Sequence, residues 1–448
     1  MPALPYDIIG IGFGPSNIAL AIALEETNYQ GRALFLECNP SSLWQQGMLL
    51  DGSDIQNNPL RDLITPVNPR SKYTFVNYLH QSGRFWHYLN LGTHYPLRKD
   101  FFRYVAWVAG QMRNVRYGID IQHVDVELRN GHPVWRLLDS KGNEYLARQL
   151  VVGTGRKPNV PNIPGLELSG NIVHLTQYLP AVQKLAPGAK VAVLGGSQSA
   201  VEIVLDLIGR EVGSIIGIHR SFSYRLKDTS AFSDEVYFPE FVDYYHALPP
   251  EKRSLLDDQV RQTNYSSADG DVISQLYLRM YEDEIDKKNR VVIFRNHAIE
   301  KVTGERELVL SLRDIYTGAA QPVHTDLLVL ATGFLDIGRN GRDGLPSLLA
   351  DVAPHFSWTG SYLDVERDYR VRFSGKSGSM PDLYLNGLCE SSHGLGDAGS
   401  FSLVSLRARD ILTSIVQRSH TNGREMVAVG PLAKTATAAN HEDHNWKT

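Results

Sequence analysis

The stretch that decides the fold is DIIGIGFGPSN at Asp7–Asn17, and VAVLGGSQSAVE at Val191–Glu202 repeats its pattern. Each is a short apolar run that ends in glycine and continues into a helical segment. This strand, glycine turn and helix hold a dinucleotide pyrophosphate, because free N–H groups and the helix dipole favour anionic oxygens. Two such units in one chain predict two dinucleotides, a combination typical of a flavin reduced by a nicotinamide.

The second predicted strand of the first unit, ALFLE at Ala33–Glu37, ends in an acid. An acid in this place, about 20 residues past the glycines, can bind ribose hydroxyls. The alternative for Glu37 is a solvated strand end. The glycine turn lies upstream at the right distance and favours the ribose role.

In the second unit, Gly195, Gly196 and a helix starting near Ser199 would bind nicotinamide phosphates. Its second strand, Ile215–His219, ends at Arg220. An Arg in this place suits the 2′-phosphate of NADPH, because a guanidinium pairs bidentately with phosphate. Arg225 and Lys227 follow closely, and solvated loop charges are the alternative interpretation of all three.

The whole chain predicts an α/β fold with two Rossmann-like dinucleotide-binding domains, for FAD and NADPH, and a small, mostly helical substrate-binding region. Residues 326–334, DLLVLATGF, repeat the apolar strand ending in TG at 151–155, so we expect the chain to return there to the first domain. The expected domains are an FAD-binding domain at 1–185 and 326–418, an NADPH-binding domain at 186–325 with a substrate-binding insertion at about 222–290, and a flexible tail at 419–448.

Periodicity predicts the other elements. Helical spacing occurs at 73–83, 98–113, 270–288 and 401–417. Alternation around turn residues predicts a β-meander at 124–128, 135–138 and 145–147, followed by a separate buried strand at 149–155. The polar stretch Ser41–Pro69 is too long for an ordinary connection, which is typical of a functional loop.

Composition argues against several classes of protein. A chain of 448 residues should form two or three domains, and its net charge of −4 gives no basic surface for nucleic acid or an anionic membrane. No apolar run reaches transmembrane length. Two cysteines, Cys38 and Cys389, and 15 histidines without HExxH-type spacing argue against a disulfide framework and a metal site. We expect a cytoplasmic protein.

Several motifs in order make the chain resemble the flavin-dependent N-hydroxylating monooxygenases, the ornithine and lysine N-hydroxylases of siderophore biosynthesis. The resemblance runs from Asp7 to about Arg409. The motifs are GFGPSN at 12–17, WQQGMLL at 44–50, IQ at 55–56 with LRDL at 60–63, NYL at 77–79, GGSQSAVE at 195–202, TNYS at 263–266, ATGF at 331–334 and HGLGD at 393–397.

The resemblance implies which residues form the site. Gln56, near the reacting edge of the flavin ring, and Asn264, which touches nicotinamide ribose and substrate, are the implied catalytic residues. The other implied FAD contacts are Gly12, Gly14, Pro15, Asn17, Glu37 and Trp44, and the NADPH contacts are Gly195, Gly196, Ser197, Gln198, Ser199, Arg220 and Asn264.

The resemblance also implies the chemistry. Reduced flavin adds O₂ at C4a, and the hydroperoxide transfers its distal oxygen to a neutral primary amine, with no metal and no acid–base pair. An alkylamine has a pKa of about 10 in water. The site must therefore favour the neutral amine by desolvation and by hydrogen-bond acceptors.

Three positions depart from the family pattern and bear on the substrate. Arg61 stands where ornithine-specific members have a Lys that pairs with the substrate carboxylate. Asp234 stands where many members have an Asn that helps bind it, and a carboxylate there would repel a carboxylate and attract a cation. Ser197 replaces the second glycine of the second turn. Either Arg61 pairs with Asp234 or Asp62, or it holds a carboxylate itself.

We therefore predict hydroxylation of a carboxylate-free primary amine, either histamine or a diamine such as putrescine or cadaverine, with O₂ as the second substrate. The alternative is L-ornithine or L-lysine, with Asn264, Arg61 and Asp234 contacting the substrate in either case. We also expect a homo-oligomer, a dimer or tetramer. Other classes that the sequence leaves open are a sulfur- or carbonyl-oxidising flavin monooxygenase, a plain reductase and a non-enzymatic nucleotide-binding sensor.

Overall fold

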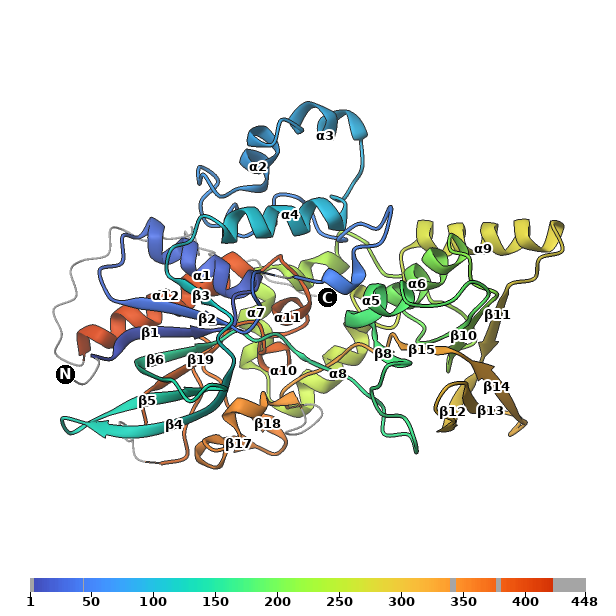
Figure 1. Cartoon of the computed structure of the whole chain (residues 1–448). Helices are drawn as coiled ribbons and strands as arrows, with labels where there is room; N and C mark the ends of the chain where they lie inside the picture. Colours follow the sequence, from blue (N-terminus) through green and yellow to red (C-terminus); the bar gives the residue numbers. More distant parts are fainter. Residues whose placement is uncertain (1–3, 43, 339–343, 376–379, 422–448) are drawn as a thin grey trace, which may run out of the picture.

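The first sheet carries the first glycine turn. The structure is a computed structural model that describes residues 4–42, 44–338, 344–375 and 380–421. The strands of this sheet are β1 (Tyr6–Ile11), β2 (Ala33–Glu37), β3 (Val115–Tyr117), β4 (Ile121–Arg129), β5 (His132–Asp139), β6 (Glu144–Val152) and β19 (Asp382–Leu385). Their order is β3-β2-β1-β6-β5-β4, with β19 paired to β6. The predicted parallel core and antiparallel meander are both present (Figure 1).

Strand β6 belongs to both parts of this sheet. The sequence predicts two strands here, at 145–147 and 149–155, but the structure has one. Tyr145 pairs with Leu137 in the antiparallel meander, and Leu150 pairs with Ile9 in the parallel core. The strand changes partner without a turn, so the expected break is wrong.

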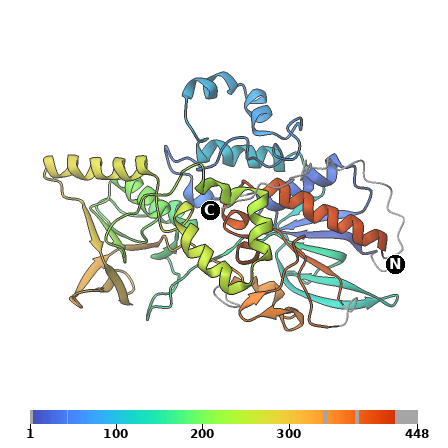
Figure 2. The same cartoon turned by 180° about the vertical axis from the view of Figure 1, so that it is seen from behind.

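Two helices lie side by side on one face of the first sheet, α1 (Pro15–Glu26) and α12 (Val404–Thr421) (Figures 1 and 2). Ile18 of α1 and Ile411 of α12 are fully buried in the same apolar core as Ile8 of β1. Helix α12 continues into the expected flexible tail as far as Thr421. The rest of that tail lies outside the described residues.

A layer of three helices lies above this domain in Figure 1, α2 (Phe75–Gln81), α3 (Phe85–Leu91) and α4 (Arg98–Ala109). The predicted helices at 73–83 and 98–113 are confirmed with shorter ends, and α3 is an addition. Aromatic rings hold the layer together. The Phe75 ring lies 5.2 Å from Phe101 and 5.4 Å from Tyr104, centre to centre.

The second sheet is fully parallel and carries the second glycine turn. Its strands are β8 (Ile172–His174), β9 (Lys190–Leu194), β10 (Ser214–His219), β11 (Val291–Arg295) and β15 (Leu327–Leu330) in the order β11-β10-β9-β15-β8. The expected return to the first domain at Asp326 is wrong for β15, because Leu328 pairs with Ala192 of β9 and Ile172 of β8. Strand β8 likewise precedes the expected boundary at residue 186.

The remaining elements surround these two sheets. The insertion adds short helices between them, with α7 and α8 in front in Figure 2, and β12, β13 and β14 form a small sheet at the end of the molecule away from the N-terminus. The helical bounds are η1 (Gln46–Met48), η2 (Leu175–Gln177), α5 (Tyr178–Val182), α6 (Gln198–Ile208), η3 (Ser233–Tyr237), α7 (Pro239–Ala247), α8 (Pro250–Val260), η4 (Arg261–Thr263), α9 (Gly270–Ile285), η6 (Ser347–Leu349), η7 (Ala353–His355), α10 (Glu390–His393) and α11 (Gly396–Gly399). The strand bounds are β7 (Lys157–Pro158), β12 (His297–Thr303), β13 (Leu308–Asp314), β14 (Ala320–Thr325), β16 (Phe334–Leu335), β17 (Trp358–Thr359) and β18 (Tyr362–Leu363). Across the described ranges, no helix combines the length and apolar character needed to span a bilayer.

Candidate active site

The first glycine turn is shaped to accept a ligand. Gly12 has φ +83°, and a Cβ there would lie 2.6 Å from the Gly153 carbonyl oxygen, so only glycine fits. Gly14 precedes α1, and a Cβ there would meet no atom within 4 Å. Pro15 starts the helix, where its missing N–H costs nothing. Open space before a helix N-terminus fits the pyrophosphate of FAD.

Asn17 supports this turn from behind. Its side chain is fully buried, and Nδ2 donates to the carbonyl oxygens of Ile11 at 3.1 Å and Gly12 at 2.7 Å. Its Oδ1 accepts from Asn386 Nδ2 at 3.0 Å. The Asn17 side chain thus fixes the turn, and its predicted contact with the cofactor stays a prediction.

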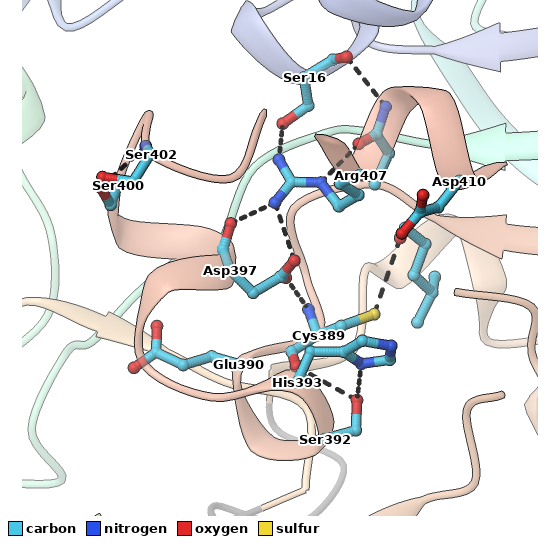
Figure 3. A network of polar contacts seen from close by, with 12 residues as sticks. Ser16, Cys389, Glu390, Ser392, His393, Asp397, Ser400, Ser402, Arg407 and Asp410 are labelled. Atoms are coloured by element: carbon cyan, nitrogen blue, oxygen red, sulfur yellow. Dashed lines mark hydrogen bonds and ion pairs between the residues drawn. The ribbon is translucent and has the colours of Figure 1, made fainter. Parts of the chain in front are cut away.

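A buried ion pair holds the start of α1 against the C-terminal segment (Figure 3). Arg407 donates to Ser16 Oγ at 2.9 Å, to Asn386 Oδ1 at 2.8 Å and to Asp397 Oδ1 at 2.8 Å. The side chains of Arg407 and Asp397 are 2% and 0% exposed. The other oxygen of Asp397, the last residue of the HGLGD motif, accepts from the Cys389 N–H. This motif thus fixes the cofactor turn from the far end of the chain.

Glu37 lies at the predicted ribose position. Its Oε2 accepts from the Phe13 N–H at 2.6 Å, and its Oε1 accepts from the Asn39 N–H at 2.9 Å and from Asn39 Nδ2 at 2.6 Å. The Cys38 thiol also lies 3.5 Å from Oε1, so Oε1 is saturated, whereas Oε2 has a single donor among the described residues and can accept a ribose hydroxyl as well. Glu37 also orients the glycine turn through Phe13.

The loop after β2 brings Trp44 and Gln56 to the domain junction. The Trp44 ring meets Phe401 edge-on at 5.0 Å and Phe101 at 6.2 Å. Gln56 adopts φ +51°, and its N–H donates to Asp54 Oδ1 at 2.9 Å. Its side-chain Nε2 is buried without a hydrogen-bond partner in the described chain. A buried, unpaired donor indicates a missing ligand, and the acceptor edge of a flavin fits it.

The second glycine turn has the same outline. Gly195 has φ +150°, and a Cβ there would lie 2.4 Å from the Ala331 carbonyl oxygen. Gly196 lies against His219, and Ser197 is the N-cap of α6 without a side-chain capping bond. Ser199 follows in the first helical turn. The tight turn ahead of a helix N-terminus fits a nucleotide phosphate.

Gln198, at the start of α6, uses its polar groups for hydrogen bonds within the protein. Its backbone N–H donates to the Ser267 carbonyl at 2.9 Å, its Oε1 accepts from the Asp269 N–H at 2.8 Å, and its Nε2 donates to Glu202 at 3.0 Å. These groups are occupied within the protein. Gln198 thus ties the turn to the insertion at about 222–290, and its predicted contact with the nucleotide stays a prediction.

Two guanidinium groups gather at the end of the second sheet. Arg220 follows β10 and is exposed, and Arg295 ends β11 in register with His219. Parallel strands bring their carboxyl ends to one edge, so both can face a phosphate there. His219 adds a buried ring nitrogen, Nε2, with no partner in the described part of the chain. This edge fits the 2′-phosphate of NADPH, and the sequence analysis missed Arg295.

Arg98 and Glu202 join the two dinucleotide-binding domains. Arg98 of α4 donates bidentately to Glu202 of α6 at 2.9 and 3.0 Å and also reaches the Met48 carbonyl at 3.0 Å. The two side chains are 10% and 6% exposed. A buried, bidentate pair of this kind fixes geometry, because removing one partner leaves an uncompensated charge. It holds the second turn against the loop that carries Gln56.

Asn264 lies where three parts of the chain meet. A Cβ on Gly399 would lie 2.8 Å from both Asn264 Nδ2 and the Tyr265 hydroxyl, so the C-terminal segment passes directly over the TNYS motif. Arg156 donates to the Tyr265 hydroxyl at 2.8 Å and to Glu390 Oε2 at 2.9 Å, and Tyr265 donates to Glu390 at 2.7 Å. This cluster fixes the residue that follows Asn264.

Glu390 is the most strongly shifted carboxyl of this cluster. Burial raises its pKa to about 8, although the Arg156 guanidinium and the Tyr265 hydroxyl act in the opposite direction. Figure 3 shows Glu390 pointing away from His393 of the same short helix. The motifs do not single out Arg156, Tyr265 and Glu390, although Tyr265 lies in TNYS and Glu390 lies three residues before HGLGD.

Arg61 makes no ion pair with any acidic side chain among the described residues. Its Nη1 lies 3.4 Å from Ser402 Oγ, and its guanidinium lies 5.9 Å from the Tyr237 ring centre. No ion pair joins Arg61 to Asp234 in the described ranges, so the expected pairing of the two is absent. Asp234 belongs to the same short helix, η3, as Tyr237, whose ring lies beside the Arg61 guanidinium.

Asp62 does not neutralise Arg61 either. Its carboxylate is fully buried and accepts from the N–H groups of Ile64, Thr65 and Phe75 and from the Thr65 hydroxyl. Asp62 is thus occupied in shaping its own loop. The Arg61 guanidinium remains available for an anionic substrate group.

Ser402 connects the two predicted substrate contacts. Its hydroxyl lies beside Arg61 and donates to Asn57 Oδ1 at 3.2 Å, and three residues earlier Gly399 lies over Asn264. Three extended residues span at most about 10 Å. Arg61 and Asn264 therefore lie beside opposite ends of the same short segment, residues 399–402. No group of three or more possible metal-ligating side chains occurs within the residues that the structure describes.

Comparison with known proteins identifies the family. The family model described as L-lysine 6-monooxygenase/L-ornithine 5-monooxygenase matches residues 4–336. The chain belongs to this family. It is 35% identical over 407 residues to the L-ornithine N(5)-monooxygenase of Burkholderia cepacia, covering 87% of this chain and 90% of that protein. The predicted family, enzyme class and α/β fold are thereby confirmed: the chain is a flavin-dependent N-hydroxylating monooxygenase.

Two solved structures extend the likeness. The Kutzneria sp. 744 ornithine N-hydroxylase, with reduced FAD, NADP⁺ and L-ornithine, matches with a TM-score of 0.85 and 28% identity over 93% of this chain and all of that one. The FAD-bound cadaverine monooxygenase of Erwinia amylovora matches with a TM-score of 0.81 and 26% identity over 98% of this chain and all of that one. The predicted cofactors agree with these relatives. Of these three relatives, two are named for ornithine and one for cadaverine.

Proposed function

We propose that this protein is an FAD- and NADPH-dependent N-hydroxylase of a basic L-amino acid, L-ornithine, in siderophore biosynthesis. The observation that carries the proposal is the guanidinium of Arg61, which lies beside Ser402 and has no ion-pair partner in the part of the chain that the structure describes. A carboxylate is the group that a free guanidinium binds best, often bidentately. The names of the relatives support the same substrate.

Asp234 also suits an amino acid. The repulsion between Asp234 and a carboxylate concerns only one of the two charged groups of an amino-acid head. An α-amino acid carries an α-ammonium next to its carboxylate, so Arg61 and Asp234 can bind opposite charges of the same substrate head. Two complementary charges fix the orientation of the head and discriminate against amines that lack one of them.

The far end of the substrate would then lie at Asn264. Bound FAD, once reduced by NADPH, supplies the activation of O₂ and the oxygen atom. The chain itself binds the amino-acid head, excludes water and holds the side-chain amine near the flavin. Asn264, which makes no side-chain hydrogen bond in the described residues, can accept from or donate to the amine and so orient it.

The proposal is tested with Arg61→Leu, with Arg70→Leu as a matched control on an exposed residue of the same loop. A lost charged hydrogen bond is worth about 1.5–3 kcal/mol, so kcat/KM for L-ornithine should fall about 10- to 100-fold in Arg61→Leu. Arg61→Lys should retain part of the kcat/KM for L-ornithine. Asp234→Asn should lower kcat/KM less than Arg61→Leu does. The measurement is hydroxylamine formed per unit time.

A diamine is the second candidate, because the Asp234 carboxylate lacks an ion-pair partner in the described ranges and would attract a second ammonium. The direction in which kcat/KM changes in Arg61→Leu separates the two candidate substrates. With a diamine substrate, removal of a nearby positive charge should leave kcat/KM unchanged or raise it. A fall for L-ornithine together with no activity on putrescine or cadaverine would exclude the diamine.

A further inference from the structure

Lys227 does not join the exposed phosphate-binding edge that its position after Arg220 suggests. Its side chain is 10% exposed, and its ammonium lies 3.2 Å from Gln56 Oε1 and 3.9 Å from Asp269 Oδ1. The Lys227 N–H donates to the Ala268 carbonyl at 2.9 Å, which turns this segment inward. The lysine therefore reaches from the insertion to the loop of the FAD-binding domain.

This contact fixes which end of the Gln56 amide faces the ligand. The two ends of a glutamine amide are chemically opposite, and their assignment follows from their neighbours. An ammonium can only donate, so the amide oxygen must face Lys227. The NH₂ end then points the other way, and Nε2 is the atom found buried without a partner in the described chain.

The backbone of Gln56 is held as well. Its φ of +51° is uncommon outside glycine, and the N–H bond to Asp54 Oδ1 keeps it there. With backbone and amide oxygen both held, the side chain has one remaining hydrogen-bonding direction. In that direction the side chain can only donate, through its NH₂ group.

We propose that Lys227 is a positioning residue that orients the Gln56 amide so that its NH₂ group donates to the acceptor edge of the flavin. The inference rests on the proposed FAD site. It assigns to Lys227 two effects on the flavin: an indirect one through the amide, and a direct one from its positive charge, which favours the more electron-rich, reduced flavin. Asp269 balances part of that charge.

The test compares Lys227→Met with Lys227→Arg, which retains a donating cation. In Lys227→Met the amide can rotate, so the ratio of reduced to oxidised FAD affinity should fall about tenfold, which lowers the two-electron midpoint potential by about 30 mV. Lys227→Arg should keep the midpoint potential close to that of the native protein. Lys301→Met, at an exposed lysine of β12, is the control and should leave the potential unchanged.

A double-mutant cycle shows whether Lys227 acts through Gln56. We expect Gln56→Glu, which retains a partner for the ammonium but has no N–H to donate, to perturb the visible spectrum of bound FAD as Lys227→Met does. Adding Lys227→Met to Gln56→Leu should then change the spectrum less than Lys227→Met does in the native protein, because only the direct effect of the charge remains. Equal spectral effects of Lys227→Met in both backgrounds, or an unaltered potential in Lys227→Met, would overturn the proposal. These readouts need no amine, so they stand even if L-ornithine is not the substrate.

Discussion

The two glycine turns share one outline but are held in place by different parts of the chain. The first turn is braced inside its own domain, by Asn17 and by the buried pair of Arg407 and Asp397. The second is tied to the substrate-binding insertion, because Gln198 bonds to Ser267 and Asp269. The first bracing suits a cofactor that stays bound, whereas the second links the nicotinamide turn to the segment that carries Asn264.

The difference teaches how one fold can use two dinucleotides differently. A fully buried network resists opening, so the FAD turn should keep its shape with or without substrate. The NADPH turn depends on hydrogen bonds to the insertion, so substrate binding and nucleotide binding should influence each other there. Reciprocal coupling of this kind is a thermodynamic requirement wherever two ligands share one element.

The largest expected effect comes from breaking the first bracing. Arg407→Ala leaves Asp397 charged and buried, which costs about 3–5 kcal/mol. We expect a lower melting temperature and loss of FAD from the purified protein, measured by thermal unfolding and flavin absorbance. Arg372→Ala, at the exposed pair with Glu366, is the matched control and should cost less than about 1 kcal/mol. Equal losses in the two variants would contradict the account.

The next effect concerns the phosphate edge. Arg220→Ala should lower kcat/KM for NADPH about 10- to 100-fold, for a charged hydrogen bond of about 1.5–3 kcal/mol, and should change kcat/KM for NADH little. Arg295→Ala should act in the same direction. Steady-state oxidation of the two nucleotides measures both. A native protein that used NADH and NADPH equally would refute this assignment.

The smallest expected effects come from two variants that test the difference between the two glycine turns directly. Gln198→Ala removes hydrogen bonds worth about 1 kcal/mol and unties the second turn from Asp269. KM should rise about fivefold for both NADPH and the amine, while FAD content stays native. Asn17→Ala should do the reverse and weaken FAD retention before it alters KM for NADPH. If Gln198→Ala changed FAD content and left both KM values unchanged, the proposed division between the turns would be wrong.

The sequence predicts the local parts of this fold well. The strand, turn and helix at both glycine turns are confirmed closely, because short apolar runs and turn glycines act within a few positions. Strand β15 is a case in which local sequence does not predict the fold. An apolar strand ending in TG is the same pattern in either sheet, and only its pairing with β9 and β8 decides which one it joins.

Local sequence likewise points to individual residues of the candidate site but not to their partners. Motifs place Gln56, Asn264 and Arg61 in one region, but their partners come from distant segments. Glu202 lies 104 residues from Arg98, and Ser402 lies 341 residues from Arg61. Proximity along the chain misled the interpretation of Lys227, which follows Arg220 closely but turns inward to Gln56. Contacts of this kind depend on tertiary topology, which spacing does not encode.

The most direct test of the account offers native protein, NADPH and O₂ with L-ornithine, L-lysine, putrescine, cadaverine and histamine in turn. Hydroxylamine formation and NADPH consumption are measured together, so that uncoupled oxidation is not counted as activity. The account predicts the highest kcat/KM and the most hydroxylamine per NADPH with L-ornithine. Efficient hydroxylation of a diamine or histamine, with L-ornithine left unreacted, would contradict it.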